Sequence, residues 1–165
     1  EAAPPSVTSP SYVELDGGGR VFADTLIAIA AGDSVTSCVD ARSSCNGVPT
    51  AGSCPTTVLG PNDDARFDLG PGGRIEIGFR CAVILEHGSV DGTASPDFRI
   101  WATVAPGARA IVAVSDDGAH FTDLGFLEIA DQTFDLARIR ATAVRFVRLA
   151  DTGQGGIAID AVEAL

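Results

Sequence analysis

The side chains best suited to acid–base chemistry in this chain are two histidines, His87 and His120, amid a large excess of carboxylates. Both histidines stand beside glycine-containing turns. Nucleophilic catalysis would need one of them next to a serine and a carboxylate, yet the sequence holds no Gly-x-Ser-x-Gly elbow. A glycosidase needs two opposed carboxylates, and spacing singles out no such pair. We therefore predict no catalytic residues and no enzymatic activity.

Trp101 is the candidate for ligand binding. Alternation along residues 98–105 places Trp101 on the same face as Arg99 and Thr103, opposite the apolar side chains. An exposed indole beside an arginine offers a sugar ring an apolar face and a polar edge. An aromatic side chain on the second face of a sheet can equally be covered by a loop or a partner subunit. Ligand binding by Trp101 and Arg99 and simple packing both remain open.

Four cysteines predict two disulfides. Cys38, Cys45, Cys54 and Cys81 are separated by six, eight and 26 residues. These spacings contain no Cys-x-x-Cys pair, and both histidines lie outside the cluster, which disfavours zinc. We expect the pairs Cys38–Cys45, closing a local loop, and Cys54–Cys81, tying residues 32–56 to the sheet. Disulfides imply an oxidising compartment, so we expect an extracellular or cell-surface protein.

The charge of the chain restricts its partners. Acidic residues number 22 against 11 basic ones, all of them arginine, which gives a net charge of −11. Nucleic acid is excluded as a partner, because phosphate backbones are bound by clustered lysine and arginine. No apolar run approaches the ~18 residues that a transmembrane helix requires.

Short apolar runs between glycines and prolines predict an all-β fold. The expected strands are 12–15, 21–31, 57–59, 65–68, 74–79, 82–86, 98–105, 109–115, 121–129, 143–150 and 156–164. One helical turn is expected near Leu136–Ile139. Residues 32–56 form a cysteine-rich insertion within a single domain, 12–165.

Residues 1–11 form a Pro/Ser/Ala tail of the linker type. Its prolines cannot donate backbone hydrogen bonds, so the useful donors are concentrated at Val7, Thr8 and Ser9. Exposed sheet edges readily accept an added strand. We therefore expect the tail to dock on its own domain or on a neighbouring subunit.

Several motifs, in order, carry a resemblance to a known group of proteins. They are Val58-Leu59-Gly60-Pro61-Asn62-Asp63, Ser95-Pro96-Asp97-Phe98-Arg99-Ile100-Trp101, Val114-Ser115-Asp116-Asp117-Gly118, and the segments 23–27, 67–79, 143–151 and 156–165. Together they resemble bacterial secreted cell-surface domains with a galactose-binding-like jelly-roll fold, over residues 21–165 apart from the insertion. The resemblance implies a two-sheet antiparallel jelly-roll sandwich. It leaves function open, because such domains serve as carbohydrate binders, adhesins and structural modules.

The resemblance also implies a calcium site. In related jelly rolls a structural calcium commonly lies where an early strand meets the last one, which here points to Asp24 and Asp160. Glu163 is a weaker third ligand, since strict alternation puts it on the opposite face from Asp160. The alternative is that these aspartates only accept hydrogen bonds from turn amides.

Two functions from different classes follow. The first is a non-catalytic surface protein for self-assembly or adhesion, a homo-oligomer such as a fibre or surface-layer subunit docked through its tail. The second is a carbohydrate-binding module of a secreted or surface protein. The tail favours the first, and Trp101 with the acidic loops favours the second.

Overall fold

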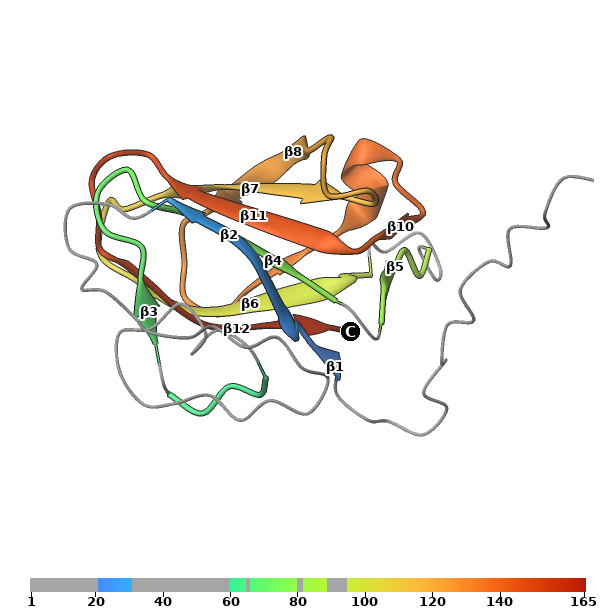
Figure 1. The fold of residues 1–165 in the computed structure, drawn as a ribbon, viewed down its shortest axis with the longest axis horizontal. Coiled ribbons are helices and arrows are strands. Elements are labelled where there is room, and N and C mark those ends of the chain that lie inside the picture. Colours follow the sequence, from blue (N-terminus) through green and yellow to red (C-terminus); the bar gives the residue numbers. More distant parts are fainter. Residues whose placement is uncertain (1–20, 31–59, 65, 80–81, 89–94) are drawn as a thin grey trace, which may run out of the picture.

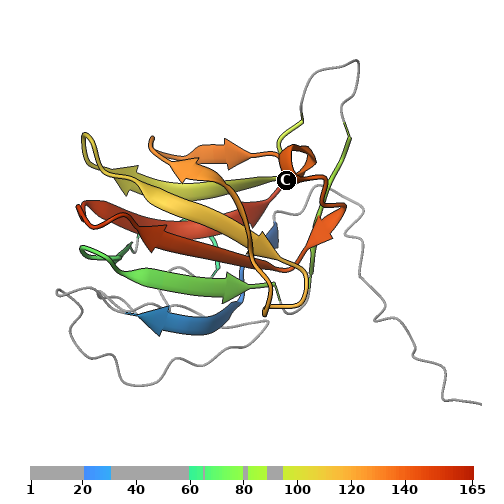
Figure 2. The same ribbon diagram turned by 90° about the horizontal axis from the view of Figure 1, so that it is seen from above.

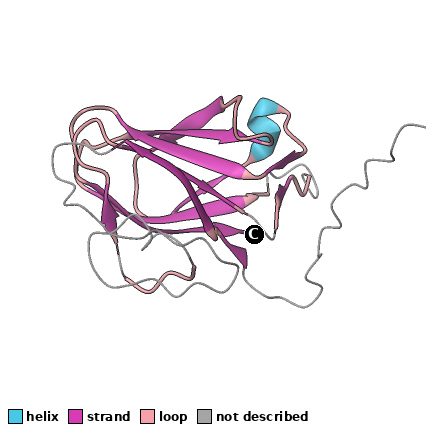
Figure 3. Cartoon of the chain, viewed as in Figure 1, coloured by secondary structure: helices cyan, strands magenta, loops and turns pink. Residues whose placement is uncertain are grey.

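A computed structural model describes residues 21–30, 60–64, 66–79, 82–88 and 95–165. The described chain is all-β and antiparallel, with one short 3-10 turn, η2 (Leu136–Ile139) (Figure 3). The cysteines, the N-terminal tail, residues 32–56 and the expected strands 12–15 and 57–59 lie outside these ranges.

Two sheets form the two layers of a sandwich (Figures 1 and 2). Sheet A contains β1 (Val21–Phe22), β3 (Phe67–Asp68), β6 (Phe98–Val104), β9 (Gln132–Phe134) and β12 (Ile157–Ala164). Sheet B contains β2 (Thr25–Ala30), β4 (Arg74–Gly78), β7 (Ala110–Ser115), β8 (Thr122–Leu127) and β11 (Phe146–Asp151). The order is β1-β12-β6-β9 in sheet A, with β3 also on β12, and β2-β4-β11-β7-β8 in sheet B. Strands β5 (Ile84–Leu85) and β10 (Ala143–Val144) pair separately.

The core lies between the sheets and follows the alternation of the strands. In β11, Val147 and Leu149 are fully buried, while Arg148 between them faces outward. Sheet A contributes Phe98 and Phe134, whose rings stack with centroids 5.3 Å apart. Each such large buried side chain stabilises the fold by roughly 1.5–3 kcal/mol through removal of apolar surface from water.

Most of the expected strands are confirmed, with shifted boundaries. The segment 21–31 is split into two strands. The backbone amide of Ala23 donates a hydrogen bond to the carbonyl of Val162 in sheet A, whereas the amide of Asp24 donates to the carbonyl of Gly78 in sheet B. The segment 143–150 is likewise split at Arg145. The expected helical turn is confirmed as η2. Strand β9 was not predicted, since its three residues are too few to show alternation.

The loop from β11 to β12 depends on glycine. Gly153 has φ +105, Gly155 has φ +69 and Gly156 has φ +83. A Cβ atom at Gly156 would lie 2.8 Å from the Cβ of Ala105, so a side chain is also excluded by contact. The Gly-rich run is therefore a turn that lets two strands of different sheets follow one another.

Candidate functional site

The outer face of sheet A brings Arg99, Trp101 and Glu163 together. Glu163 lies directly opposite Arg99 in the pairing of β12 with β6, and Ala161 lies opposite Trp101. The Trp101 indole Nε1 donates a hydrogen bond to a carboxylate oxygen of Glu163 at 2.8 Å. The Arg99 guanidinium lies 4.9 Å from the centre of the Trp101 ring. The two predicted ligand-binding residues are thus neighbours, and Glu163 joins them.

This cluster is partly closed. Glu163 is only 4% exposed, and the Arg99 Nε is buried with no hydrogen-bond partner in the described chain. The cation above the indole contributes on the order of 1 kcal/mol. Because the indole N–H already has an acceptor, the polar edge that a sugar would use is occupied. The geometry favours the packing interpretation of Trp101.

Asp160 holds a turn. The pairing of β12 with β6 shifts between Ile159 and Ala161, so Asp160 occupies a bulge and simple alternation does not extend from it to Glu163. Its carboxylate accepts hydrogen bonds from the backbone amides of Asp63 at 3.2 Å and Asp64 at 3.1 Å. Burial raises the pKa of Asp160, and the two amides oppose that rise.

The three carboxylates proposed for calcium are not assembled into one donor set. Calcium takes six to eight oxygen ligands, yet Asp160 accepts two amide hydrogens and Glu163 accepts an indole hydrogen. Asp24 lies in the link between β1 and β2, with its amide bonded to Gly78. No group of three metal-ligating side chains occurs among the described residues. The arrangement supports the turn-amide interpretation of Asp160, and calcium stays a prediction.

Two further buried aspartates play the same role as Asp160, and sequence reasoning missed both. Asp97 accepts hydrogen bonds from the amides of His87 and Leu136, and Asp151 accepts them from glycine amides in two loops. A carboxylate that accepts several N–H groups replaces the hydration it loses on burial. Part of the acidic composition is therefore structural. The available signal was the position of Asp151 directly before a Gly-rich turn.

The β7–β8 hairpin carries a serine, an aspartate and a histidine in contact. The Ser115 hydroxyl donates to Asp117 at 2.9 Å, and the His120 Nδ1 lies 2.7 Å from the other Asp117 oxygen. The aspartate is therefore between the other two, whereas a nucleophilic serine needs the histidine as its immediate neighbour. The Ser115 oxygen also accepts the amide of Gly118 at 2.9 Å. These contacts hold the turn.

The Asp117–His120 pair has a measurable signature. The hydrogen bond to Asp117 and that carboxylate's charge raise the pKa of His120, with a smaller contribution from Asp116, while the same bond lowers the pKa of Asp117. The pair therefore stabilises the hairpin between the ordinary pKa values of aspartate and histidine. This contribution is lost as the pH rises through the His120 pKa or falls through the Asp117 pKa.

We expect an NMR titration to give a His120 pKa above the usual histidine value. In Asp117→Asn it should fall back toward that value, because the charge and the ionic hydrogen bond are removed. His87 in the same spectra is an internal reference for the substitution. An unchanged His120 pKa in Asp117→Asn would mean that the pair does not form in solution.

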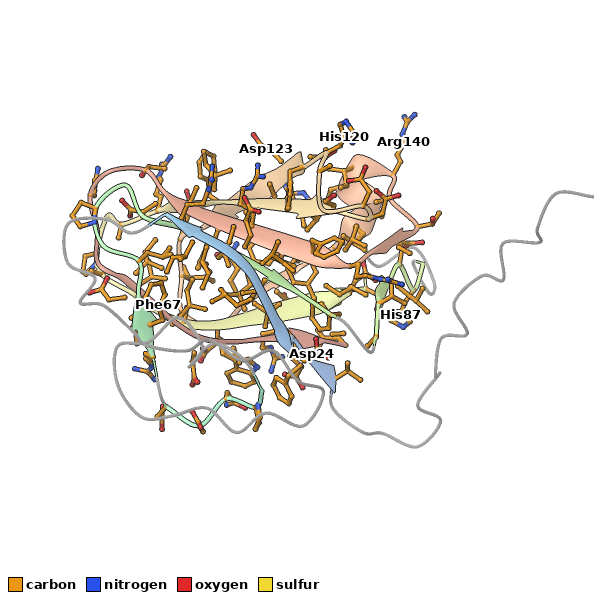
Figure 4. All side chains as sticks on the ribbon, viewed as in Figure 1. Asp24, Phe67, His87, His120, Asp123 and Arg140 are labelled. Carbon is orange, nitrogen blue, oxygen red and sulfur yellow. The ribbon has the colours of Figure 1, made fainter. Side chains whose placement is uncertain are left out.

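A cavity of about 280 Å³ opens beside this hairpin, between β7–β8 and the segment that follows η2. Its lining includes Asp116, His120 and Thr122 on one side and Ile139 and Arg140 on the other. Figure 4 shows the labelled His120 and Arg140 side chains on the same side of the molecule. No local sequence pattern marks this cavity, because its two walls are about twenty residues apart in the chain.

Comparison of the chain with models of protein families, with curated proteins and with solved structures gave no match. Within the described ranges, no helix has the length and apolar character needed to cross a membrane.

Proposed function

We propose that this chain is a non-catalytic extracellular or cell-surface domain that self-assembles, with the N-terminal tail of one copy added to the edge of sheet B in the next. The observation that carries the proposal is strand β2. It is the outermost strand of sheet B, and within the described chain no strand pairs with its outer edge. Its sequence, Thr-Leu-Ile-Ala-Ile-Ala, contains no charge and no proline.

The other edges of the sandwich are protected in ways that β2 is not. Strands β1 and β3 have two residues each and β9 has three, too few to template a partner. Strand β8 carries the exposed charge of Asp123, whereas β2 carries no charge, although the pairing of each strand contains a register shift. In β2, by contrast, Ile27 is 44% exposed and Ile29 is 39% exposed. An uncharged, apolar edge strand of six residues is the form that accepts an added strand.

The proposed occupant is the Val7-Thr8-Ser9 segment of a neighbouring copy. Prolines flank this segment and confine its backbone donors to a stretch shorter than β2, and Val7 supplies one apolar side chain. The Val7-Thr8-Ser9 segment therefore fits within the length of strand β2, and its backbone groups can form hydrogen bonds with the outer edge of that strand. The extracellular assignment rests on the four cysteines, and a fibre or surface layer is the assembly that repeated tail-to-edge contacts would build.

We also assign the sandwich to the jelly-roll type. Apart from the β7–β8 hairpin, which stays in sheet B, successive strands of the two sheets alternate between the layers, with β3, β6 and β12 in sheet A and β4, β7 and β11 in sheet B. Each of the two sheets therefore interleaves early and late strands, as two Greek keys folded together would. The order β3-β12-β6-β9 against β4-β11-β7-β8 supports this assignment.

The alternative function is a carbohydrate-binding module that uses Trp101 and Arg99. It is favoured by the partial exposure of Trp101 on the outer face of sheet A. It is weakened by the indole N–H, which Glu163 already accepts. The non-catalytic assignment in both cases is supported by the Ser115–Asp117–His120 geometry, which holds a turn.

Lysine at the exposed edge position is expected to prevent assembly. In Ile27→Lys the ammonium group would have to be desolvated on strand addition, whereas the isolated domain should fold unchanged because Ile27 is exposed. Sedimentation velocity over a concentration series measures the change, with oligomers for the unmodified chain and monomers for the variant. Ile129→Lys is the control, since Ile129 is 64% exposed and lies outside the strands. Equal assembly of both variants would contradict the β2 interface.

A further inference from the structure

The cavity beside the β7–β8 hairpin has the size of a small-ligand site. Its volume of about 280 Å³ lies just below the range that is typical of such sites, roughly 300–1,000 Å³. Val114 and Val144 contribute buried apolar surface to the lining, and Ile139 adds a half-buried side chain. Because Val114 and Val144 are almost fully buried, the lining that a ligand would meet is mostly polar.

Arg140 is the unusual residue of this cavity. It ends η2 in the left-handed conformation, with φ +57, where glycine is the preferred residue and any other side chain carries a steric cost. Its backbone amide closes the turn by donating to Ala137. In the described part of a chain with twice as many acidic as basic residues, Arg140 makes no ion pair. Backbone strain of this kind is concentrated at functional sites.

The other polar groups of the rim suit hydroxyl groups. Asp116 offers a carboxylate acceptor, and Thr122 and Thr142 offer hydroxyls that both donate and accept. His120 is held through its Nδ1 by Asp117, which leaves Nε2 as the ring nitrogen not committed to that bond. Arg140 therefore lines the same cavity as one carboxylate, two threonine hydroxyls and the His120 ring.

We propose that this cavity binds a small hydroxylated carboxylate, with the carboxylate on Arg140 and the hydroxyls on Asp116, Thr122 and His120. Planar guanidinium binds carboxylate through two parallel hydrogen bonds, which a neutral hydroxyl cannot reproduce. A free hydroxy acid and a uronic-acid residue of a polysaccharide share this chemistry. The site is separate from the β2 edge, so it stands whether or not the domain assembles.

D-Galacturonate and D-galactose are a matched pair of probes, because they differ in the carboxylate. We expect galacturonate to bind with a roughly millimolar Kd and to shift the amide resonances of residues 115–122 and 139–144. Galactose is expected to bind about tenfold more weakly or not at all, because it lacks the charge-assisted bonds to Arg140. Absence of shifts in these segments, or equal binding of the two sugars, would overturn the proposal.

Arg140→Gly separates binding from folding. Glycine relieves the left-handed strain at this position, so the melting temperature should equal or exceed that of the unmodified chain, while the preference for galacturonate should be lost. Arg138→Ala is the control, since Arg138 is an exposed arginine of η2 that does not line the cavity. Retained galacturonate preference in Arg140→Gly, or equal loss in Arg138→Ala, would show that Arg140 is not the anchor.

A third probe, the trimer of galacturonate, identifies the source of the ligand. Tighter binding of the trimer than of the monomer indicates a polysaccharide that continues out of the open cavity. If the trimer and the monomer bind equally well per carboxylate, the ligand is a free hydroxy acid.

Discussion

Asp97→Ala is expected to lower the free energy of unfolding by about 3–5 kcal/mol, because two hydrogen bonds to a buried charge are lost together. The Asp97 side chain is fully buried, and its carboxylate accepts the amide of Leu136 at 2.7 Å and that of His87 at 2.9 Å. Alanine removes both acceptors and leaves the buried Leu136 amide without a partner. The His87 imidazole, 3.4 Å from the same carboxylate, loses its contact as well.

Urea denaturation measures this loss, with an unchanged m-value showing that the native fold persists. Asp135→Ala is the matched control, because Asp135 lies at the same end of η2 and accepts one exposed amide, that of Ala137 at 2.8 Å. Asp135→Ala is expected to lower the free energy of unfolding by about 1 kcal/mol. Asp97→Asn keeps one acceptor oxygen, so its loss of unfolding free energy should lie between those of Asp97→Ala and Asp135→Ala. Equal losses of unfolding free energy in Asp97→Ala and Asp135→Ala would mean that burial of the Asp97 carboxylate does not increase its contribution to stability.

Asp151→Ala is expected to lower the free energy of unfolding by about 3 kcal/mol, which corresponds to a fall of roughly 6–12 °C in Tm. The Asp151 carboxylate accepts the amides of Gly72 at 2.9 Å, Gly153 at 2.6 Å and Gly155 at 3.1 Å. It thereby joins the turn before β4 to the loop between β11 and β12. Without it, glycine-rich loops with high backbone entropy lose their common anchor.

Thermal unfolding combined with amide hydrogen exchange tests this account. Exchange should accelerate at Gly155 in Asp151→Ala, because that amide is buried and bonded to Asp151 alone among the contacts described. Asp68→Ala is the control at the same end of the sandwich, since Asp68 accepts one amide, that of Gly70 at 2.9 Å, from an exposed position. A fall in Tm no larger than in Asp68→Ala would contradict the anchoring role of Asp151.

Local patterns predicted much of this fold. Alternation placed Trp101 on the outer face of its strand, opposite the apolar side chains, because the period of a strand depends only on neighbouring residues. The Ser115–Asp117–His120 contacts span a few residues and are of the kind that turn chemistry produces.

Long-range partners could not be predicted in the same way. Trp101 meets Glu163 across 62 positions, and Leu136 meets Asp97 across 39, through strand pairings that no local pattern specifies. The bulge at Asp160 also broke the alternation that had separated it from Glu163. The cavity walls at His120 and Arg140 meet only because the hairpin and η2 pack at one end of the sandwich.

The proposed assembly and the proposed ligand site use different surfaces. Strand β2 lies at one edge of sheet B, whereas the cavity involves β7 and β8 at the opposite side of that sheet. Tail-to-edge contacts would therefore leave every cavity of an assembly accessible. A surface layer or fibre of such subunits would present repeated copies of a weak site, and multivalency would raise its avidity for a polymer.

Electron microscopy of the full chain beside a chain lacking residues 1–11 is the decisive test of assembly through the tail and strand β2. The tail is the proposed donor strand and β2 the proposed acceptor, so the full chain should form filaments or sheets and the shortened chain should remain as single particles with an unchanged circular dichroism spectrum. A synthetic peptide of residues 1–11 should bind the shortened chain and should fail to bind its Ile27→Lys variant. Filaments formed without the tail, or a full chain that stays monomeric at all concentrations, would contradict the account.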